Sequence, residues 1–494
     1  MNDPTAVLVA ISVALDAVLV ALAWWHVLLS RRLPASKLLW MGIVLFLPLV
    51  GTLVYAGFGA DRHGRRATAK ELTNEALRER LDPAVGARLR LALSEDGRTE
   101  QPVLPLEARD FPERLDPLAM LLARLGRFRA LSGNRLDVLT PDAFFDALIE
   151  EIDGARVAVL VEVYILDTDR LGRRLLSALE RAAARGVRSL VLIDALGSID
   201  AKRDVLDVSR ARGVRIEQFD QRSFLRGRFQ VNLRNHRKLA VVDGLSAYLG
   251  SANVSARHLA EASAEERSDD LCVRLAGPTV AQLTAVFAED WYSTTGEALV
   301  DGALYPPPTE RGRVVCRPLP SGPDGDHGVF HDVLAAAIHA AQRSVRIVTP
   351  YFVPSEVVAC ALGVAALRGL EVTVVVPERA DARIVDWAAR AHIEPLLQRG
   401  VRILRRPPPF LHGKLLLVDG RWALFGSSNV DPRSFFLNYE LNLGITGAEG
   451  VGPLVAWEAD VRAGATPVDP DAWATRGLLT RAWENLVALA SPLL

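Results

Sequence analysis

The chain has 494 residues, a length that predicts about three domain-sized units, and its formal net charge at pH 7 is −1. So small a net charge excludes a strong overall field that would attract a polyanion such as nucleic acid. The three cysteines, Cys272, Cys316 and Cys360, are widely spaced without a C-x-x-C pair, which argues against a disulfide framework or a zinc cluster.

Two apolar runs open the chain. Residues 6–30 are interrupted only by Asp16 and His26, and residues 38–58 carry no charge. At a rise of about 1.5 Å per residue, each run can cross a hydrocarbon core of about 30 Å. The first residues lack the basic group of a signal peptide, so we expect residues 1–60 to form a transmembrane hairpin. Basic residues flank the hairpin almost equally, and we place the main body on the cytoplasmic side.

The rest of the chain is expected to form two α/β lobes. Residues 61–115 are charged and helix-prone, and we interpret them as a helical linker. Strands rich in Val, Ile and Leu then alternate with helical segments in two successive series. This pattern predicts mixed sheets flanked by helices, with a first lobe at 116–300, an interlobe linker at 301–325 and a second lobe at 326–494. The second lobe ends in an amphipathic helix, for which a membrane surface and a protein core are both suitable partners.

One signature, H-x-K-x-x-x-x-D, occurs twice at an offset of 176 residues. A Gly-Ser-x-Asn follows each copy at the same offset, and further along an acidic residue opens an apolar strand. The matched residues are His236, Lys238, Asp243, Ser251, Asn253 and Asp270 in the first copy, and His412, Lys414, Asp419, Ser427, Asn429 and Glu440 in the second. The chain therefore carries two copies of one site.

The repeated residue types suit a phosphodiester. On a strand, a His and a Lys two positions apart face the same side. The lysines supply positive charge, and the Ser and Asn side chains can donate to non-bridging phosphate oxygens. One imidazole can attack phosphorus while the other protonates the leaving alkoxide, and Asp270 and Glu440 are available to orient the two rings. This chemistry requires no cofactor, and lysines on the same face disfavour the rival interpretation of a metal site.

The paired signatures resemble those of the phospholipase D superfamily, and the chain is similar over nearly its whole length to the bacterial cardiolipin synthases within it. The similar flanking segments are residues 47–51, 55–59, 349–354, 430–434, 437–440 and 491–494. The resemblance implies pseudo-twofold lobes whose signatures meet in one cleft of an inner-membrane enzyme. It implies transfer of a phosphatidyl group between two phosphatidylglycerol molecules, giving cardiolipin and glycerol, with His236 as nucleophile and His412 as acid and then base.

The chain departs from the family pattern in two places. Gly413 stands inside the second signature where a hydroxyl residue is common, and Ser268 and Asp269 stand where Trp-Arg is common. We expect altered hydrogen bonding in the second half-site and altered headgroup contacts in the first. Asp243 and Asp419 are counted with the catalytic set, although their position beyond the strand fits a structural role equally well.

A basic segment supports a lipid substrate. Between Asp220 and Asp243 there is no acid, but Arg234, Arg237 and other basic residues are interleaved with aromatic ones. Such a segment suits an anionic bilayer surface, and a solvated loop has the same composition.

Three other functions compete with this interpretation. A nuclease would need an extended basic track rather than a membrane hairpin. A phospholipase D that hydrolyses its intermediate would use the same residues, and a non-catalytic membrane scaffold would be expected to lose a signature His or Lys. The sequence leaves open whether the second lipid is phosphatidylglycerol or phosphatidylethanolamine, and it leaves the oligomeric state open.

Overall fold

The structure is a computed structural model that describes residues 4–30, 34–59, 116–125, 127–219, 233–324 and 327–489. The expected linker at 61–115 and most of the basic segment after Asp220 lie outside these residues. The described chain comprises an N-terminal helical unit and an α/β body, and each is treated by itself.

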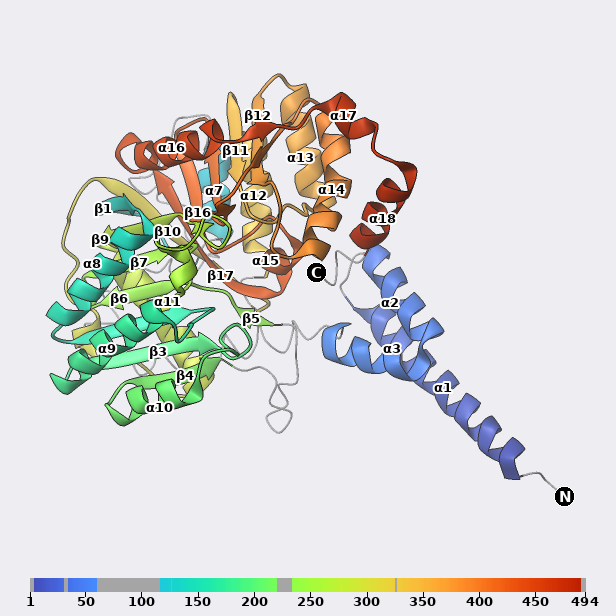
Figure 1. Cartoon of the computed structure of the whole chain (residues 1–494), viewed down its shortest axis with the longest axis horizontal. Helices are drawn as coiled ribbons and strands as arrows, with labels where there is room; N and C mark the ends of the chain where they lie inside the picture. The colour runs from blue at the N-terminus through green and yellow to red at the C-terminus, as the bar shows by residue number, and fades with distance from the viewer. Residues whose placement is uncertain are drawn as a thin grey trace. The chain divides into compact units, whose positions relative to one another are not determined.

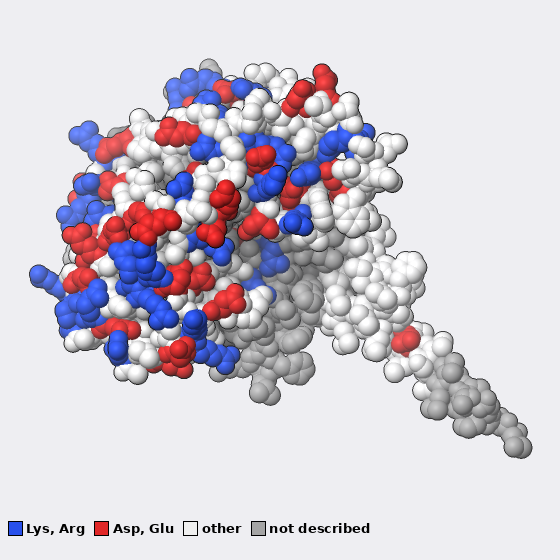
Figure 2. Space-filling view, in the orientation of Figure 1, with Lys and Arg blue, Asp and Glu red and all other residues white. Residues whose placement is uncertain are grey.

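The N-terminal unit consists of α1 (Pro4–Leu29), α2 (Pro34–Phe46), α3 (Pro48–Val54) and a short π-helical turn, η1 (Tyr55–Gly59). Val27, Trp40 and Tyr55 are buried among these helices, and the Tyr55 hydroxyl lies 2.7 Å from His26 Nδ1. Most other apolar side chains of α1 point outward, and Figure 2 shows almost no charge on this unit.

The expected pair of membrane-spanning helices is only partly present. Among the described residues, one helix, Ile11–Leu29, is long and apolar enough to cross a membrane. The second apolar run is not one continuous helix, because it breaks at Leu47 before Pro48, whose ring cannot continue the hydrogen-bond ladder of α2. At about 1.5 Å per residue, α2 alone is shorter than a hydrocarbon core.

The body is built on one mixed sheet, in which the described residues form a path of 15 strands, and a sixteenth strand, β5 (Arg234–Asn235), pairs with β17 (Asn438–Thr446) off this path (Figure 1). The first repeat contributes β1 (Leu131–Leu139), β2 (Ala158–Val163), β3 (Arg188–Asp194), β4 (Arg215–Phe219), β6 (Leu239–Val242), β7 (Ser246–Gly250) and β9 (Cys272–Ala276). The second repeat contributes β10 (Val314–Ser321), β11 (Ser344–Val348), β12 (Glu371–Pro377), β13 (Arg402–Arg406), β15 (Leu415–Val418), β16 (Trp422–Gly426), β17 (Asn438–Thr446) and the edge strand β18 (Thr466–Pro467).

The order of the strands shows the internal repeat. It runs β4-β3-β2-β6-β7-β9-β1 in the first repeat and continues β10-β17-β16-β15-β11-β12-β13 in the second, so that equivalent strands are arranged symmetrically about the β1–β10 pair. In each repeat three adjacent strands are parallel, β2-β3-β4 and β11-β12-β13, and the other pairs of this path are antiparallel. The predicted α/β class with mixed sheets is therefore confirmed.

Helices cover both faces of the sheet. The first repeat carries α8 (Pro141–Gly154), α9 (Arg170–Ala184), α10 (Arg203–Ala211) and α11 (Thr279–Thr295). The second repeat carries α12 (Val329–Ala340), α13 (Glu356–Leu367), α14 (Arg383–Leu397), the short α15 (Pro432–Phe436), α16 (Ala448–Ala463), the short α17 (Pro470–Ala474) and α18 (Leu478–Leu489). One core unites side chains of α11 and α16 with strands of both repeats, which makes the two lobes one packing unit.

Two predicted domain boundaries are wrong. The expected linker at 301–325 contains β10, which is buried along its length and pairs with both β1 and β17. Helix α7 (Asp116–Leu125), expected in the first lobe, instead buries Leu118 and Leu122 in the core of the second repeat. The amphipathic helix expected at the C-terminal end is α18, which packs on α14 through Trp483 and Trp387 while Leu478, Leu479 and Leu486 stay exposed.

Candidate active site

Each signature is held by a short strand that pairs across the repeats. Strand β5 (Arg234–Asn235) runs parallel to the start of β17, and His236 N–H then donates to Tyr439 O at 2.9 Å. In the same way β14 (Phe410–Leu411) pairs with β8 (Ser268–Asp269), and His412 N–H donates to Asp269 O at 2.8 Å. Each signature histidine is therefore anchored beside the acidic residue of the other copy.

The histidine and carboxylate pairs are crossed between the copies. His236 Nδ1 lies 3.0 Å from Glu440 Oε2, and His412 Nδ1 lies 2.7 Å from Asp270 Oδ1. An ionised carboxylate can only accept, so Nδ1 carries the proton and Nε2 of each ring keeps its lone pair. Both carboxylates are buried, as orienting groups for histidine should be.

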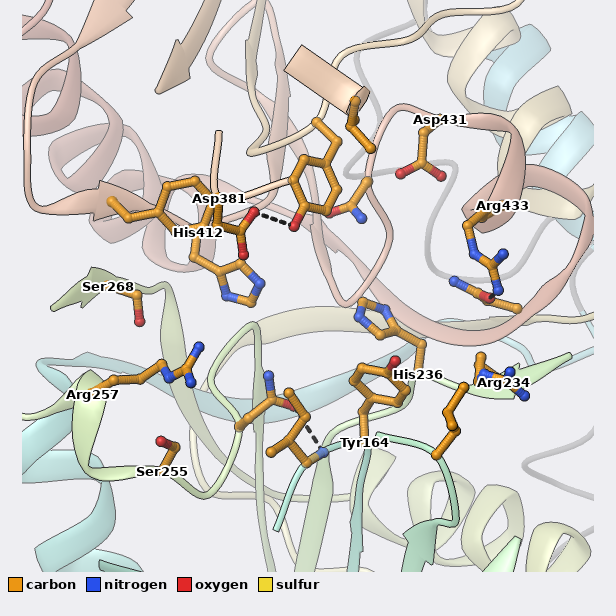
Figure 3. A pocket seen from close by; sticks show the side chains of 18 of the residues that line it. Tyr164, Arg234, His236, Ser255, Arg257, Ser268, Asp381, His412, Asp431 and Arg433 are labelled. Carbon is orange, nitrogen blue, oxygen red and sulfur yellow. Dashed lines mark hydrogen bonds between the residues drawn. The ribbon is translucent and has the colours of Figure 1, made fainter. Parts of the chain in front are cut away.

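Both imidazoles enter one pocket. The pocket has a volume of about 430 Å³, and its wall includes His236, His412, Asn253 and Asn429. Figure 3 shows the two rings projecting into the same space from opposite walls. The histidines of the two signatures thus line one pocket.

Burial keeps the imidazoles neutral, whereas neighbouring side chains keep the carboxylates ionised. Burial lowers the pKa of His236 to about 4, against the opposing charge of Glu440, and burial together with the charge of Lys414 lowers the pKa of His412 to about 3. Burial alone would raise the pKa of Asp270 and Glu440. The neighbouring histidines outweigh that effect and hold both carboxyl pKa values below their ordinary range.

The signature lysines are buried close to one another. Lys238 Nζ donates to His236 O at 2.8 Å, and Lys414 Nζ donates to His412 O at 2.6 Å. Burial, and then the charge of Lys414, lowers the pKa of Lys238 to about 7, while burial lowers the pKa of Lys414 to about 8. An anionic ligand would offset the burial of both amines and favour their charged forms.

The phosphate contacts predicted for the two serines are wrong. Ser251 Oγ donates to Asp270 Oδ1 at 2.7 Å, and Ser427 Oγ donates to Glu440 Oε2 at 2.5 Å. Neither serine lines the pocket, and both hold the carboxylates that orient the histidines. Asn253 does face the pocket, and since its Oδ1 accepts Ile165 N–H at 3.3 Å, its amide N–H groups are left for a ligand.

The catalytic role assigned to Asp243 and Asp419 is corrected in the same way. Each lies in the turn after its strand with a left-handed backbone, φ 52° and 55°. The Asp243 carboxylate accepts the backbone N–H groups of residues 156–158, and that of Asp419 accepts those of residues 342–344. Neither lines the pocket. These aspartates fasten the β6–β7 and β15–β16 hairpins to the starts of β2 and β11.

A third histidine, which the repeated signature does not predict, joins the site. His258 Nδ1 lies 2.5 Å from Asp270 Oδ2, so Asp270 serves two imidazoles. In the second copy the equivalent position, 176 residues later, is Ser434, which donates to Glu440 Oε1 at 2.8 Å. Extending the repeat beyond Asn253 would have identified this pair.

The two departures from the family pattern have structural explanations. Ser268 Oγ donates to Asp270 Oδ2 at 2.7 Å, and Asp269 supplies the backbone carbonyl that anchors His412. At Gly413 the indole of Trp457 occupies the space that a Cβ atom would need. The missing side chain at Gly413 is therefore required by packing.

Part of the basic segment is not available to a membrane surface. Arg237 is buried, donates from Nε to Glu440 O at 3.1 Å and pairs with Asp290, so its predicted role at a bilayer is wrong. Arg234 instead lines the pocket beside His236. Within the residues that the structure describes, no group of three or more His, Cys, Asp or Glu side chains is placed to hold a metal ion.

Comparison with known proteins identifies the family. A model described as "Cardiolipin synthase, PLD-like domain" matches residues 148–291 and 334–457, and a phospholipase D-nuclease N-terminal model matches residues 18–59. The chain belongs to the cardiolipin synthase family of phospholipase D-like proteins. Cardiolipin synthase A of Pseudomonas fluorescens is 35% identical over 423 residues, covering 85% of each chain. Cardiolipin synthase of Geobacillus thermodenitrificans is 31% identical over 94% of this chain and 90% of the relative.

A solved structure shows the same fold at low identity. The phosphatidylserine synthase of Haemophilus influenzae aligns with a TM-score of 0.59 and 15% identity, covering 76% of this chain and all of that one. The predicted phospholipase D-like lobes of the cardiolipin synthase family are therefore confirmed.

Proposed function

We propose that this chain is a cardiolipin synthase, which transfers the phosphatidyl group of one phosphatidylglycerol to a second and releases glycerol. One observation carries the proposal: two imidazoles, each oriented through Nδ1 by a buried carboxylate, enter the same pocket. Membership of a family whose relatives are named cardiolipin synthase supports phosphatidyl transfer as the reaction.

In the first half-reaction His236 is the nucleophile. Its Nε2 lone pair attacks phosphorus, and the bond from phosphorus to the glycerol oxygen breaks on the opposite side. His412, neutral in the free protein, takes up a proton from solvent at Nε2 when the anionic headgroup binds, and the ionised Asp270 stabilises the resulting imidazolium. This imidazolium gives its Nε2 proton to the departing oxygen. A pKa of about 4 keeps His236 neutral, as the attack requires.

The lysines and asparagines stabilise the charge that builds on the non-bridging oxygens. The charges of Lys238 and Lys414 both act on His236, and that of Lys414 also acts on His412, while Asn253 and Asn429 line the pocket wall. Fixed donors in a site with little water are effective because they need no reorganisation as charge develops.

In the second half-reaction the hydroxyl of another phosphatidylglycerol gives its proton to His412 Nε2. The resulting oxygen attacks phosphorus, the phosphorus–nitrogen bond to His236 breaks, and cardiolipin leaves. Water in the place of the second lipid would yield phosphatidic acid, which is the hydrolase alternative.

The asymmetry between the copies supports the assignment of roles. Asp270, which holds His412, also contacts His258, whereas Glu440 holds His236 together with uncharged groups, among them Ser427 and Ser434. A second imidazole on the same carboxylate suits the side of the site that releases and takes up a proton.

The chain is associated with the membrane, where its lipid substrate resides. The apolar helix α1 and the matched N-terminal family model support this association. Insertion of α2 and α3 into the same bilayer, and a cytoplasmic position of the body, stay predictions.

The test is an assay of the purified chain in detergent micelles of phosphatidylglycerol. Cardiolipin and glycerol should appear in equal amounts, and both should disappear with His236→Ala and with His412→Ala but not with His339→Ala, a change at an exposed histidine of α12. Phosphatidic acid without cardiolipin would indicate a hydrolase. The absence of both products would indicate a scaffold.

A further inference from the structure

The repeat places a second pair of charged residues in the pocket. Arg257 and Arg433 are 176 residues apart, at the same offset as the signatures. Both line the pocket that holds the histidines. In Figure 3 Arg257 lies on the side of His412, and Arg433 lies on the side of His236. The internal symmetry thus puts one guanidinium at each end of the site.

The two arginines have different surroundings. Arg433 Nη2 lies 3.5 Å from Asn438 Oδ1, and Asp431 lines the same part of the pocket. Arg257 is exposed, and among the residues that the structure describes it has neither a hydrogen-bond partner nor an ion-pair partner. The carboxylate of Asp381 also lies on the side of His412, but it accepts the Tyr351 hydroxyl at 2.6 Å, so the Arg257 guanidinium is left for an anionic ligand.

The direction of the reaction places a second phosphate there. If His236 attacks phosphorus, the leaving and entering oxygens lie opposite it, beside His412. An entering phosphatidylglycerol carries its own phosphate one glycerol unit beyond the reacting hydroxyl. The acceptor phosphate therefore falls at the His412 end of the pocket, where Arg257 stands.

We propose that Arg257 binds the phosphate of the acceptor lipid and so favours transfer to lipid over transfer to water. This inference rests on the proposed function. A guanidinium can give two parallel N–H groups to phosphate oxygens, which fixes the position of the acceptor as well as its charge. The ligand class is an alcohol that bears a phosphodiester, and neither glycerol nor water has such a group.

The test compares acceptors with and without a phosphate. Exchange of labelled glycerol into phosphatidylglycerol reports formation of the intermediate and its return to an uncharged acceptor. Formation of cardiolipin reports transfer to the lipid acceptor, and formation of phosphatidic acid reports transfer to water. The variants are Arg257→Gln, Arg257→Lys and, as a matched loss of charge, Arg203→Gln at an exposed position of α10 that does not line the pocket.

With Arg257→Gln we expect the phosphatidylglycerol concentration needed for half-maximal cardiolipin formation to rise about tenfold, the usual order for one lost charge-assisted contact. The ratio of cardiolipin to phosphatidic acid should fall by a similar factor, while glycerol exchange changes less than about twofold. Arg257→Lys should restore part of the ratio, and Arg203→Gln should match the unaltered enzyme.

Equal losses of cardiolipin formation and glycerol exchange in Arg257→Gln would overturn the proposal, because they would place the arginine in the first half-reaction. An unchanged product ratio would overturn it as well. If the unaltered enzyme exchanged no glycerol and made no cardiolipin, the proposed function itself would fall.

Discussion

His236 Nδ1 and Glu440 Oε2 lie 3.0 Å apart although 204 residues separate the two side chains in the chain. His412 and Asp270 form the equivalent contact in the other direction. Each signature histidine therefore belongs to one repeat and is oriented by a carboxylate of the other. Neither repeat alone contains an oriented signature histidine.

The crossed pairs predict different effects for the two carboxylates. Glu440→Gln should slow formation of the phosphohistidine, because the nucleophile His236 loses the group that fixes its tautomer, and the comparable loss in serine proteases is about 10⁴-fold in kcat. Asp270→Asn should slow both half-reactions, because His412 acts in each, so the covalently labelled fraction should fall less than in Glu440→Gln. The measurement is the labelled fraction after rapid mixing with phosphatidylglycerol labelled at phosphorus. Greater labelling in Glu440→Gln than in Asp270→Asn would reverse the assigned roles.

The lysine pair predicts that anion binding weakens as the pH rises. In the free enzyme the pKa of Lys238 is about 7 and that of Lys414 about 8. A bound anion raises the pKa of both lysines, so above about pH 7 the complex holds more protons than the free protein. The affinity for the anion must therefore fall as the pH increases through this range. Sulfate, whose charge is constant there, is a suitable probe in calorimetry with buffers of different ionisation enthalpy. Proton uptake at about pH 8 should shrink in Lys238→Met, and an affinity independent of pH would contradict the prediction.

The motif aspartates should affect stability rather than catalysis. Asp243→Asn keeps a side chain suited to the left-handed turn but replaces one acceptor oxygen by an amide that faces backbone donors. We expect a loss of about 1–3 kcal/mol in the free energy of unfolding. The same change at Asp419 should act alike. The measurements are the free energy of unfolding in denaturant and kcat of the folded fraction. A large loss of kcat with unchanged stability would show that Asp243 and Asp419 act in catalysis.

His258 should act as a positioning residue for His412. His258→Ser installs the residue type of the equivalent Ser434 and keeps a donor near Asp270, whereas His258→Ala removes the donor. We expect kcat to fall about a hundredfold with alanine, within the range of orienting groups, and clearly less with serine. Equal effects of the two substitutions, with unchanged melting temperatures, would show that Asp270 does not depend on this donor.

The sequence allowed the chemistry of the site to be predicted, because two matched sets of His, Lys, Asn and acid are informative without coordinates. It did not show that the pairs cross, because a strand pattern does not say which strand ends meet. The structure places His236 directly after β5, outside any strand, and Glu440 within β17. The role predicted for Ser251 is wrong for a related reason. The sequence alone does not distinguish a serine whose hydroxyl contacts a ligand from one whose hydroxyl donates to a neighbouring carboxylate, here that of Asp270.

Proline accounts for two of the errors in the fold. The run Pro306–Pro308 and the Gly- and Pro-containing stretch after Ser321 indicate a linker at 301–325, yet β10 lies between them and accommodates Pro318 and Pro320 inside the sheet. Pro48 has the opposite effect, because it stands in an apolar run that is long enough to span a membrane and yet ends the helix there. In both cases only the packing of the finished sheet or helix pair decides how the chain accommodates the ring.

The contrast between His258 and Ser434 also has an evolutionary meaning. A symmetric homodimer made from one repeat would be forced to place the same residue beside both carboxylates. Fusion of two copies into one gene product removes that constraint, so one half can specialise for covalent capture while the other specialises for proton exchange.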